Sequence, residues 1–183
     1  MLKFIPIGGI GGVTKNMYVY EYQDKILVID CGIGFPDATM LGVDLLIPDV
    51  SYLVENKHKI AAVVLTHGHD DHIAGLPYIL PSLGDVPIYG SKLTIAFAEE
   101  RLADFGVAAK LNVLADDQAT NLGGFSIEAI KVTHSVPDAR HIAITTQEGL
   151  IYHGPDIKFD LNPVDGVLPE FQKMALLGKR VVL

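Results

Sequence analysis

The sequence has no tryptophan and only one cysteine, Cys31, in 183 residues. A single cysteine excludes an internal disulfide framework and fits a reducing compartment, and its position in an apolar run predicts a small buried side chain. No apolar run approaches the roughly 18–20 residues that span a bilayer, and the N-terminus lacks the cleavage-site pattern of a secretory signal. We therefore expect a cytoplasmic protein with no membrane partner.

Positive charge is also scarce in this chain. There are 14 lysines and arginines against 22 aspartates and glutamates, which gives a formal net charge of -8. Nonspecific nucleic-acid affinity comes from clustered basic side chains, so a polyanionic partner would need a local attraction. Hydrophobic residues, by contrast, make up 49% of the chain. That content and the length exclude disorder and predict one domain over residues 1–183 with a substantial core.

Short runs rich in β-branched and aromatic residues predict strands along the whole chain. These runs are residues 2–7, 16–22, 25–30, 61–67, 125–134, 141–146 and 149–153. The stretches that suit helices are residues 71–83, 92–106 and 169–178. The early strands are close enough to form hairpins and a meander, whereas the later strands alternate with helices. This order favours an α/β domain with sheet in the middle and helices outside over an all-parallel sheet.

The stretch LTHGHDDH places three histidines and two aspartates directly after an apolar run. If the strand continues, its period of two points His67 and His69 to the same side, where they can share one ion. Asp70 suits the N-cap of the next segment, which places Asp71 and His72 in a first helical turn, where they can serve a second ion. Imidazole and carboxylate groups suit zinc. A solvated polar turn is the simpler alternative, but five such side chains after a buried strand argue against it.

Further ligands must come from other strand ends, because one cluster cannot complete two coordination shells. The run FSIEAIKVTH ends on His134, and GLIYHGPD ends on Asp156. A carboxylate with two oxygens can bridge ions that lie roughly 3.5–4 Å apart, so Asp156 is the candidate bridge. KILVID ends on Asp30, which we expect to accept a hydrogen bond that fixes the tautomer of a histidine.

These residues carry a family resemblance. The motif T-H-G-H-D-D-H, with the later His134 and Asp156, resembles the HxHxDH signature of the metallo-β-lactamase superfamily, which implies an αββα sandwich with a dinuclear site at its edge. The whole chain is similar to the ribonuclease J family of the β-CASP branch. The segments that carry this similarity are TKNMYVYEY, VIDCGIGFPD, MLGVDLLIPDVSYL, LTHGHDDHIAGLPYIL, VPIYGSKLT, VTHSVPD and GPDIKFD.

The resemblance implies a set of ligands and a reaction. One zinc would be held by His67, His69 and His134, the other by Asp71 and His72, with Asp156 as the bridge; Mn²⁺ or Mg²⁺ can take the place of zinc. Catalysis would fall to Asp71, His72 and Asp156 around a metal-bound hydroxide that attacks a phosphodiester of an RNA substrate. The expected activity is 5′–3′ exonucleolytic, endonucleolytic or both, in RNA processing and decay, and the full-length enzyme is expected to be a homodimer.

The resemblance also implies missing parts. In the family, a β-CASP domain, a last metal-binding histidine and motifs that contact RNA come after the point that corresponds to Leu183. The end of the chain, MALLGKRVVL, is interpreted as a helix followed by a strand cut short. We therefore expect an incomplete sandwich that is inactive or weakly active alone. It is interpreted as the N-terminal part of a longer enzyme, with a stand-alone truncated relative as the alternative. The ion held by His67, His69, His134 and Asp156 is expected to bind more readily than the other.

Several positions depart from the family pattern. Gly12 stands in place of an acidic residue, and Pro155 directly precedes Asp156, where it removes a backbone donor. His141 stands where the family favours a small residue. An extra metal ligand is one interpretation of it, and a surface or half-buried histidine is the one we expect. His153 is expected to pack beside the site without binding metal.

Other interpretations remain open at the level of sequence. Ser135 can contact a phosphate, although a serine after a strand is more often a turn residue. The tyrosines at positions 18, 20 and 22 can stack on bases, but a strand face that covers a core explains them more simply. The same fold can hydrolyse a lactone, a thioester or a β-lactam, and a noncatalytic metal-holding module is a further alternative. Assays on RNA and on these small molecules separate the possibilities.

Overall fold

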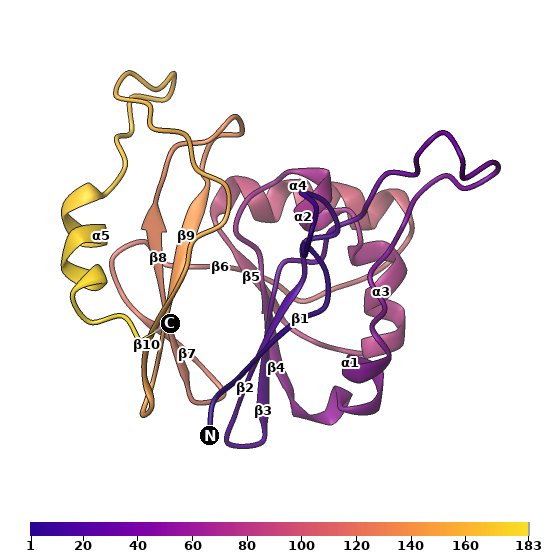
Figure 1. Cartoon of the computed structure of the whole chain (residues 1–183), viewed down its shortest axis with the longest axis horizontal. Helices are drawn as coiled ribbons and strands as arrows, with labels where there is room; N and C mark the ends of the chain where they lie inside the picture. Colours follow the sequence, from indigo (N-terminus) through magenta and orange to yellow (C-terminus); the bar gives the residue numbers. More distant parts are fainter. Residues whose placement is uncertain (183) are drawn as a thin grey trace.

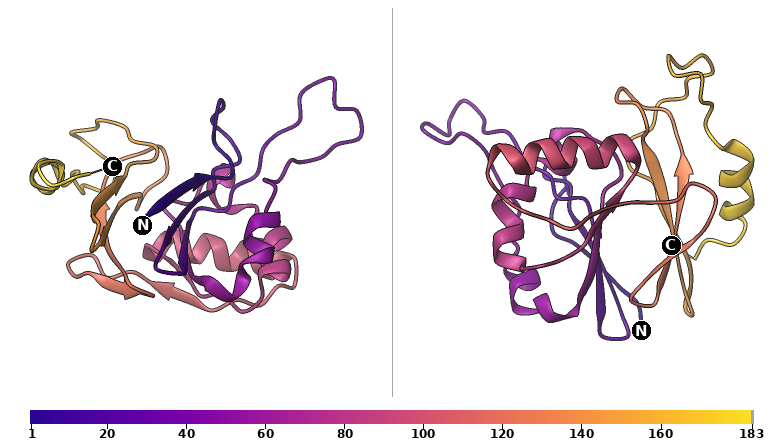
Figure 2. Two further views of the ribbon diagram at one scale, coloured as in Figure 1. Left: turned by 60° about the horizontal axis from the view of Figure 1, so that its bottom comes forward. Right: turned by 180° about the vertical axis from the view of Figure 1, so that it is seen from behind.

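Residues 1–182, which the computed structural model describes, form two β-sheets that lie face to face with helices on their outer faces (Figure 1). From one side to the other, the layers are helix α5, the smaller sheet, the larger sheet and the other helices. Figure 2 shows the same order from behind. The molecule is therefore an αββα sandwich, the α/β architecture that the sequence predicts.

The larger sheet contains, within the described residues, six strands in the order β1-β2-β3-β4-β5-β6. β1 pairs antiparallel with β2, and β2 with β3, whereas β3 to β6 run parallel. This is the expected meander followed by strands that alternate with helices. The strands are β1 (Lys3–Pro6), β2 (Tyr18–Tyr22), β3 (Lys25–Ile29), β4 (Ile60–Val64), β5 (Ile88–Gly90) and β6 (Leu111–Val113).

The smaller sheet is antiparallel throughout, in the order β10-β9-β8-β7. Its strands are β7 (Thr120–Leu122), β8 (Phe125–Lys131), β9 (Arg140–Thr146) and β10 (Gly149–His153). The helices on the outer face of the larger sheet are α1 (Ser51–Glu55), the 3-10 turn η1 (Lys57–Lys59), α2 (Asp70–Ile73), α3 (Leu76–Leu83) and α4 (Lys92–Asp104). Helix α5 (Phe171–Gly178) covers the smaller sheet.

Both faces of the larger sheet are buried, because alternate residues of a strand point to opposite sides. Val19 and Val28 face the helices, whereas their neighbours Tyr20 and Leu27 point into the core between the sheets. Tyr22 lies in the same inter-sheet core. The interpretation of the tyrosine face as a core face is therefore confirmed for these two tyrosines. A third cluster joins the smaller sheet to α5 and consists of Ile130, Ala143, Leu150 and Leu177.

Two local predictions are wrong. The single helix expected over residues 71–83 is divided into α2 and α3, because the N–H of Gly75 donates to the carbonyl of Cys31 (2.8 Å) and Pro77 has no N–H to donate to the preceding turn. Gly75 lies so close to the loop after β3 that a Cβ would clash with the carbonyl oxygens of Cys31 and Gly32. Asp70 is not the N-cap of α2. His69, with an extended backbone, is the cap, and the Asp70 carboxylate is drawn to the guanidinium of Arg101 on α4.

The elements that the sequence did not predict are short. β5, β6 and β7 have three residues each and α1 has five, so no periodic pattern can develop in them.

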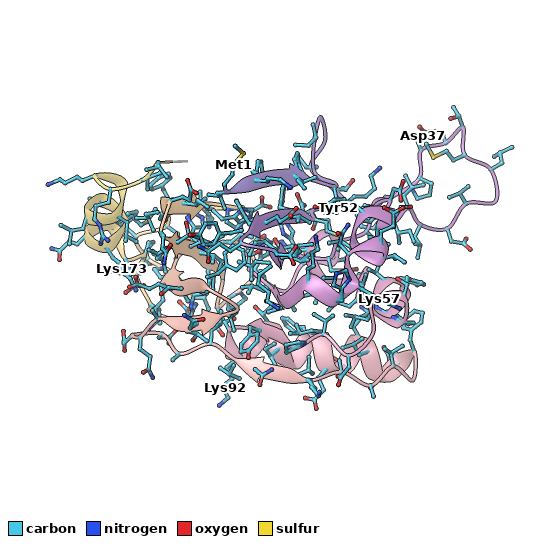
Figure 3. The ribbon with its side chains drawn as sticks, turned by 90° about the horizontal axis from the view of Figure 1, so that it is seen from below. Met1, Asp37, Tyr52, Lys57, Lys92 and Lys173 are labelled. Atoms are coloured by element: carbon cyan, nitrogen blue, oxygen red, sulfur yellow. The ribbon has the colours of Figure 1, made fainter. Side chains whose placement is uncertain are left out.

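The strand expected at the end of the chain is a single bridge between Leu150 and Val181, and Leu183 lies outside the described residues. The protruding loop that carries Asp37 stands apart from the sandwich (Figure 3). In the described part of the chain, no helix is both long and apolar enough to cross a membrane.

Strands β3, β4, β8 and β10 all end at one edge of the sandwich, the upper edge in Figure 1. The two sheets are joined there by a backbone hydrogen bond from the N–H of Arg140 to the carbonyl of Thr66 (2.9 Å). The loops that follow these strands therefore meet, and they carry the polar residues singled out in the sequence.

Candidate metal centre

Asp30, directly after β3, is the buried anchor of this edge. Its carboxylate accepts hydrogen bonds from the backbone N–H of Thr66 (2.8 Å), from the Thr66 hydroxyl (2.8 Å) and from His72 Nδ1 (2.7 Å). Burial alone would raise the pKa of Asp30, but His72, His67 and the Thr66 N–H together outweigh burial and hold that pKa below its usual range. The prediction that Asp30 accepts a hydrogen bond from a histidine is confirmed.

The hydrogen bonds of Asp30 define the free nitrogen of two histidines. A carboxylate only accepts, so His72 Nδ1 carries a proton, and in the neutral imidazole that metal ligation requires His72 Nε2 keeps its lone pair. The Thr66 hydroxyl donates its one hydrogen to Asp30. It must therefore accept a hydrogen bond from His67 Nδ1, which lies 3.0 Å away. His67 Nε2 therefore also keeps a lone pair. One carboxylate thus orients both rings, one of them directly and the other through a threonine.

The first ligand set consists of His67, His69, His134 and Asp156, each of which offers one atom within 4.8 Å of all the others. His69 Nδ1 lies 3.1 Å from His67 Nε2 and 3.2 Å from His134 Nε2, and Asp156 Oδ2 lies 3.4 Å from His134 Nε2. Donor atoms that surround one ion tetrahedrally at about 2.0–2.1 Å lie about 3.3 Å from one another. The spacing of this set therefore fits a single metal ion.

The protonation of the first ligand set also suits a metal. Burial lowers the pKa of His67 to about 3, and burial together with His69 lowers that of His134. Metal ligation requires neutral imidazoles, so these two rings are ready to bind at neutral pH. His69 is held on its other side, where Ser135 Oγ lies 3.2 Å from His69 Nε2. The contact that the structure records for Ser135 is therefore with a ring of the first ligand set.

The second ligand set consists of Asp71, His72 and Asp156 and is more open. His72 Nε2 lies 3.7 Å from Asp71 Oδ2 and 4.0 Å from Asp156 Oδ2. Asp156 follows β10, its side chain is half exposed, and its Oδ2 atom faces both sets. All six residues singled out in the sequence thus lie at one edge, four in the first ligand set and the other two beside Asp156.

Asn16, just before β2, is a site residue that the sequence analysis missed. Its Nδ2 lies 3.0 Å from His72 Nε2 and 3.1 Å from Asp71 Oδ2. Asparagine in a loop has no spacing that points to a metal, so only its place in the segment TKNMYVYEY could have marked it. A cavity of about 380 Å³ opens beside it, and Tyr18, His72 and Asp156 contribute to its wall.

The remaining histidines lie outside both ligand sets. His153 lines the cavity, and its Nδ1 lies 2.9 Å from the Tyr20 hydroxyl, so it packs beside the site as expected. The prediction of a surface or half-buried His141 is wrong, because this ring is buried against the Tyr152 hydroxyl of the neighbouring strand (2.9 Å). Burial lowers the pKa of both histidines to about 4. His58 in η1 is exposed.

Residues 10–155 match the family model of the metallo-beta-lactamase superfamily. The chain is 43% identical over 190 aligned residues to ribonuclease J of Thermus thermophilus, a match that covers 100% of this chain and 33% of that protein. It is 40% identical over 186 residues to ribonuclease J of a Synechocystis species, covering 100% of this chain and 29% of the relative. The chain therefore spans about a third of the length of the curated relatives it matches.

Among solved structures, the metallo-beta-lactamase fold protein YhfI from Bacillus subtilis is similar to this chain with a TM-score of 0.60 and 25% sequence identity. The similarity covers 83% of this chain and 61% of YhfI. The two layers of sheet and the outer helices are thus shared with a known fold, and the sequence relatives extend the similarity to the whole of this chain.

Proposed function

The chain belongs to the metallo-beta-lactamase superfamily, and from this premise we propose that it is the metal-binding part of a cytoplasmic, ribonuclease J-like enzyme that hydrolyses RNA phosphodiesters. The observation that carries the proposal is the convergence of four ligand atoms from loops far apart in the chain to within 4.8 Å of one another. Identities of 43% and 40% to two ribonucleases J support RNA as the substrate class.

We assign the ligands as follows. His67, His69 and His134 hold one divalent cation, Asp71 and His72 hold the other, and Asp156 faces both. Zinc suits the imidazoles, and Mn²⁺ or Mg²⁺ suits the carboxylates. Such a pair of cations supplies an activated water molecule at neutral pH and offsets the charge that develops on a phosphoryl group.

The chain's own groups orient the ligands. Asp30 holds the proton of His72 on Nδ1, and through Thr66 it holds the proton of His67 on Nδ1 as well. Each ring therefore presents Nε2 without rotation or tautomer exchange, which is the usual purpose of a carboxylate behind a metal-binding histidine. His72 and Asp156 contribute to the wall of the cavity, and Asp71 lies beside His72, so we assign the catalytic role to these three residues.

The activity of the whole protein is part of the proposal, because the chain spans only 29–33% of the length of the two relatives compared. We propose that the enzyme cleaves RNA from the 5′ end, internally or in both ways, and that it acts as a homodimer. The chain alone would have weak activity or none, because the RNA-binding surface of a polyanion-cleaving enzyme needs more positive charge than a net charge of -8 offers.

Hydrolysis assays test this proposal. Any cleavage of a 5′-monophosphorylated RNA by the chain should be slow, should require Zn²⁺ or Mn²⁺, and should be absent from the Asp71→Asn variant. His58→Ala, which changes an exposed histidine in η1, is the control and should behave as wild type. Turnover of a chromogenic lactam or thioester in place of RNA would favour the small-molecule alternative. Tight metal binding by the chain, with no turnover of any phosphodiester even by the full-length protein, would favour a metal-holding module.

A further inference from the structure

We propose that Asn16 is a positioning residue of the second ligand set, and that its side-chain amide holds Asp71 in the orientation that a second ion requires. The inference rests on the proposed two-ion function. It concerns a residue that is neither a titratable group nor one of the assigned ligands, and it follows from the hydrogen bonds of the amide.

The backbone fixes Asn16 against the loops that carry the ligands. Its N–H donates to the carbonyl of Asp71 (3.0 Å), and its own carbonyl accepts from the N–H of Gly32 (2.9 Å). The side chain is only 7% exposed. Asn16 is therefore held in place on both sides before its amide makes any contact, so the amide is presented to the ligands from a rigid position.

The amide has one more acceptor than it has hydrogens. Nδ2 carries two hydrogens, but it lies 3.1 Å from the Val13 carbonyl, 3.1 Å from Asp71 Oδ2 and 3.0 Å from His72 Nε2. His72 Nε2 has a single lone pair, which either accepts a hydrogen bond or binds an ion. When that lone pair goes to an ion, the two hydrogens match the two remaining oxygens. The hydrogen-bonding capacity of Asn16 is thus satisfied completely when the second ligand set binds metal.

The orientation of the amide is set by Tyr18. The Tyr18 hydroxyl donates to Asn16 Oδ1 (2.9 Å), so the oxygen is turned away from Asp71 and the NH₂ group is turned toward it. Gly9 makes room for this pair. A Cβ at that position would clash with the Tyr18 hydroxyl and with Asn16 Oδ1, and its φ of 73° also favours glycine. The Asn16 amide therefore presents its NH₂ group to Asp71 in a defined orientation, which a side chain that merely fills space would not do.

The Asn16→Ala variant tests the inference by ion binding rather than by activity. Calorimetric titration of the 183-residue chain with Mn²⁺, together with electron paramagnetic resonance of the paired ions, counts and separates the two binding events. Loss of a group that orients a ligand typically costs about 10–100-fold in metal affinity. We expect that loss for the second ion and an unchanged affinity for the first.

The matched control is Asn112→Ala. Asn112 on β6 also donates two hydrogen bonds from its amide, to the carbonyls of Ile88 and Lys110 (3.3 and 3.2 Å), but it belongs to neither ligand set. A general effect of losing a hydrogen-bonded amide would appear in both variants. We expect both ions to bind to the control as they bind to wild type.

Tyr18→Phe provides a second variant that keeps the ring and removes only the hydroxyl. With the amide free to turn, we expect the second ion to bind several-fold more weakly, by a factor smaller than that of Asn16→Ala. In the Asn16→Ala background, Tyr18→Phe should have no further effect on the second ion, because the hydroxyl acts only through the amide. This double-mutant cycle would not show coupling if the two residues merely supported the loop.

The outcomes separate the inference from the proposed function. If wild type binds two ions and Asn16→Ala binds the second with equal or higher affinity, the positioning role is wrong and the proposed function stands. If wild type binds only one ion, the two-ion proposal itself fails. Weaker binding of both ions by Asn16→Ala, but not by Tyr18→Phe, would also overturn the inference, because it would show a structural defect.

Discussion

The two ligand sets at the edge of the sandwich differ in geometry although they share Asp156. The first set is rich in imidazole, with neighbouring ligand atoms 3.1–3.4 Å apart. In the second set, the ligand atoms of His72 lie 3.7 Å from Asp71 and 4.0 Å from Asp156, and an asparagine amide contacts two of the three residues. The short motif THGHDDH therefore contributes His67 and His69 to a closely spaced set and Asp71 and His72 to a more open one.

The cause of the difference is the change of backbone at His69. Before it the chain is extended, so His67 and His69 project to one side, and after it the chain turns into α2 with Asp71 and His72 in the first turn. The first set also draws His134 from the loop after β8. We therefore expect the first set to bind its ion more tightly than the second set binds its own.

The largest effect is expected for His67→Ala. Removing a ligand should cost more than the 10–100-fold that typically follows loss of an outer partner, so the first ion should be lost at micromolar metal. Elemental analysis of the dialysed protein measures this loss. His58→Ala changes an exposed histidine and should leave the ion content unchanged. Retention of both ions by His67→Ala would show that the first ligand set does not depend on this ring.

Asp30→Asn is expected to have the next largest effect, because it weakens both sets unequally. The second ion should bind about 10–100-fold more weakly through the direct contact with His72, and the first less so, because Asp30 reaches His67 only through Thr66. The variant also disturbs the buried hydrogen bonds that Asp30 accepts from Thr66 and His72, and a buried donor left unsatisfied costs about 1–3 kcal/mol in the free energy of unfolding. Chemical denaturation and calorimetry measure the two effects, with the exposed Asp104→Asn as control. An equal loss of affinity for both ions would contradict the conclusion that Asp30 acts directly on His72 but only indirectly on His67.

Acidification should release the ions in order. Burial opposes protonation of His72, but Asp30, together with Asp71 and Asp156, outweighs burial and raises the pKa of His72. Burial lowers the pKa of His67 to about 3. A group with a raised pKa binds protons at higher pH and competes with a cation there. The second ion should therefore leave first as the pH falls from neutral. Manganese resonance spectra followed during acid titration test the order, and earlier release of the first ion would reverse the ranking.

Ser135→Ala is expected to have the smallest effect. It removes the contact between Ser135 Oγ and His69 Nε2, and a net hydrogen bond of about 1 kcal/mol corresponds to about fivefold in affinity. Only the first ion should be affected. The exposed Ser51→Ala, a serine at the start of α1, is the control. A much larger loss of RNA cleavage than of ion affinity would instead assign Ser135 to contact with a phosphate.

The parts of the site that could be predicted from sequence are those with a local signal. A histidine or aspartate at the end of an apolar run marks the edge of a sheet, and this rule found His134, Asp156 and Asp30. Asn16 escaped because a loop asparagine has no periodic or terminal signal. Its role depends on a hydrogen bond to Asp71, 55 residues along the chain.

The wrong predictions also have non-local causes. The ring of His141 is buried against the Tyr152 side chain of the neighbouring strand β10, and nothing in its neighbours along the chain indicates that partner. Asp70 is a good N-cap residue by type, but Arg101 on another helix offers its carboxylate a stronger, charged contact. In both cases a residue from a distant element outweighed the local preference.

Residue order alone was sufficient for the strand-rich α/β architecture and for the choice of histidines and aspartates as a metal-binding group, because alternation and ligand chemistry are local properties. The spacing of those ligands, the dependence of His72 and His67 on one buried carboxylate, and the place of Asn16 required the folded chain. The physical reason is that hydrogen bonds and ligand distances of a few ångströms depend on how separate loops meet at the edge of two packed sheets, and that meeting results from the packing of the whole core.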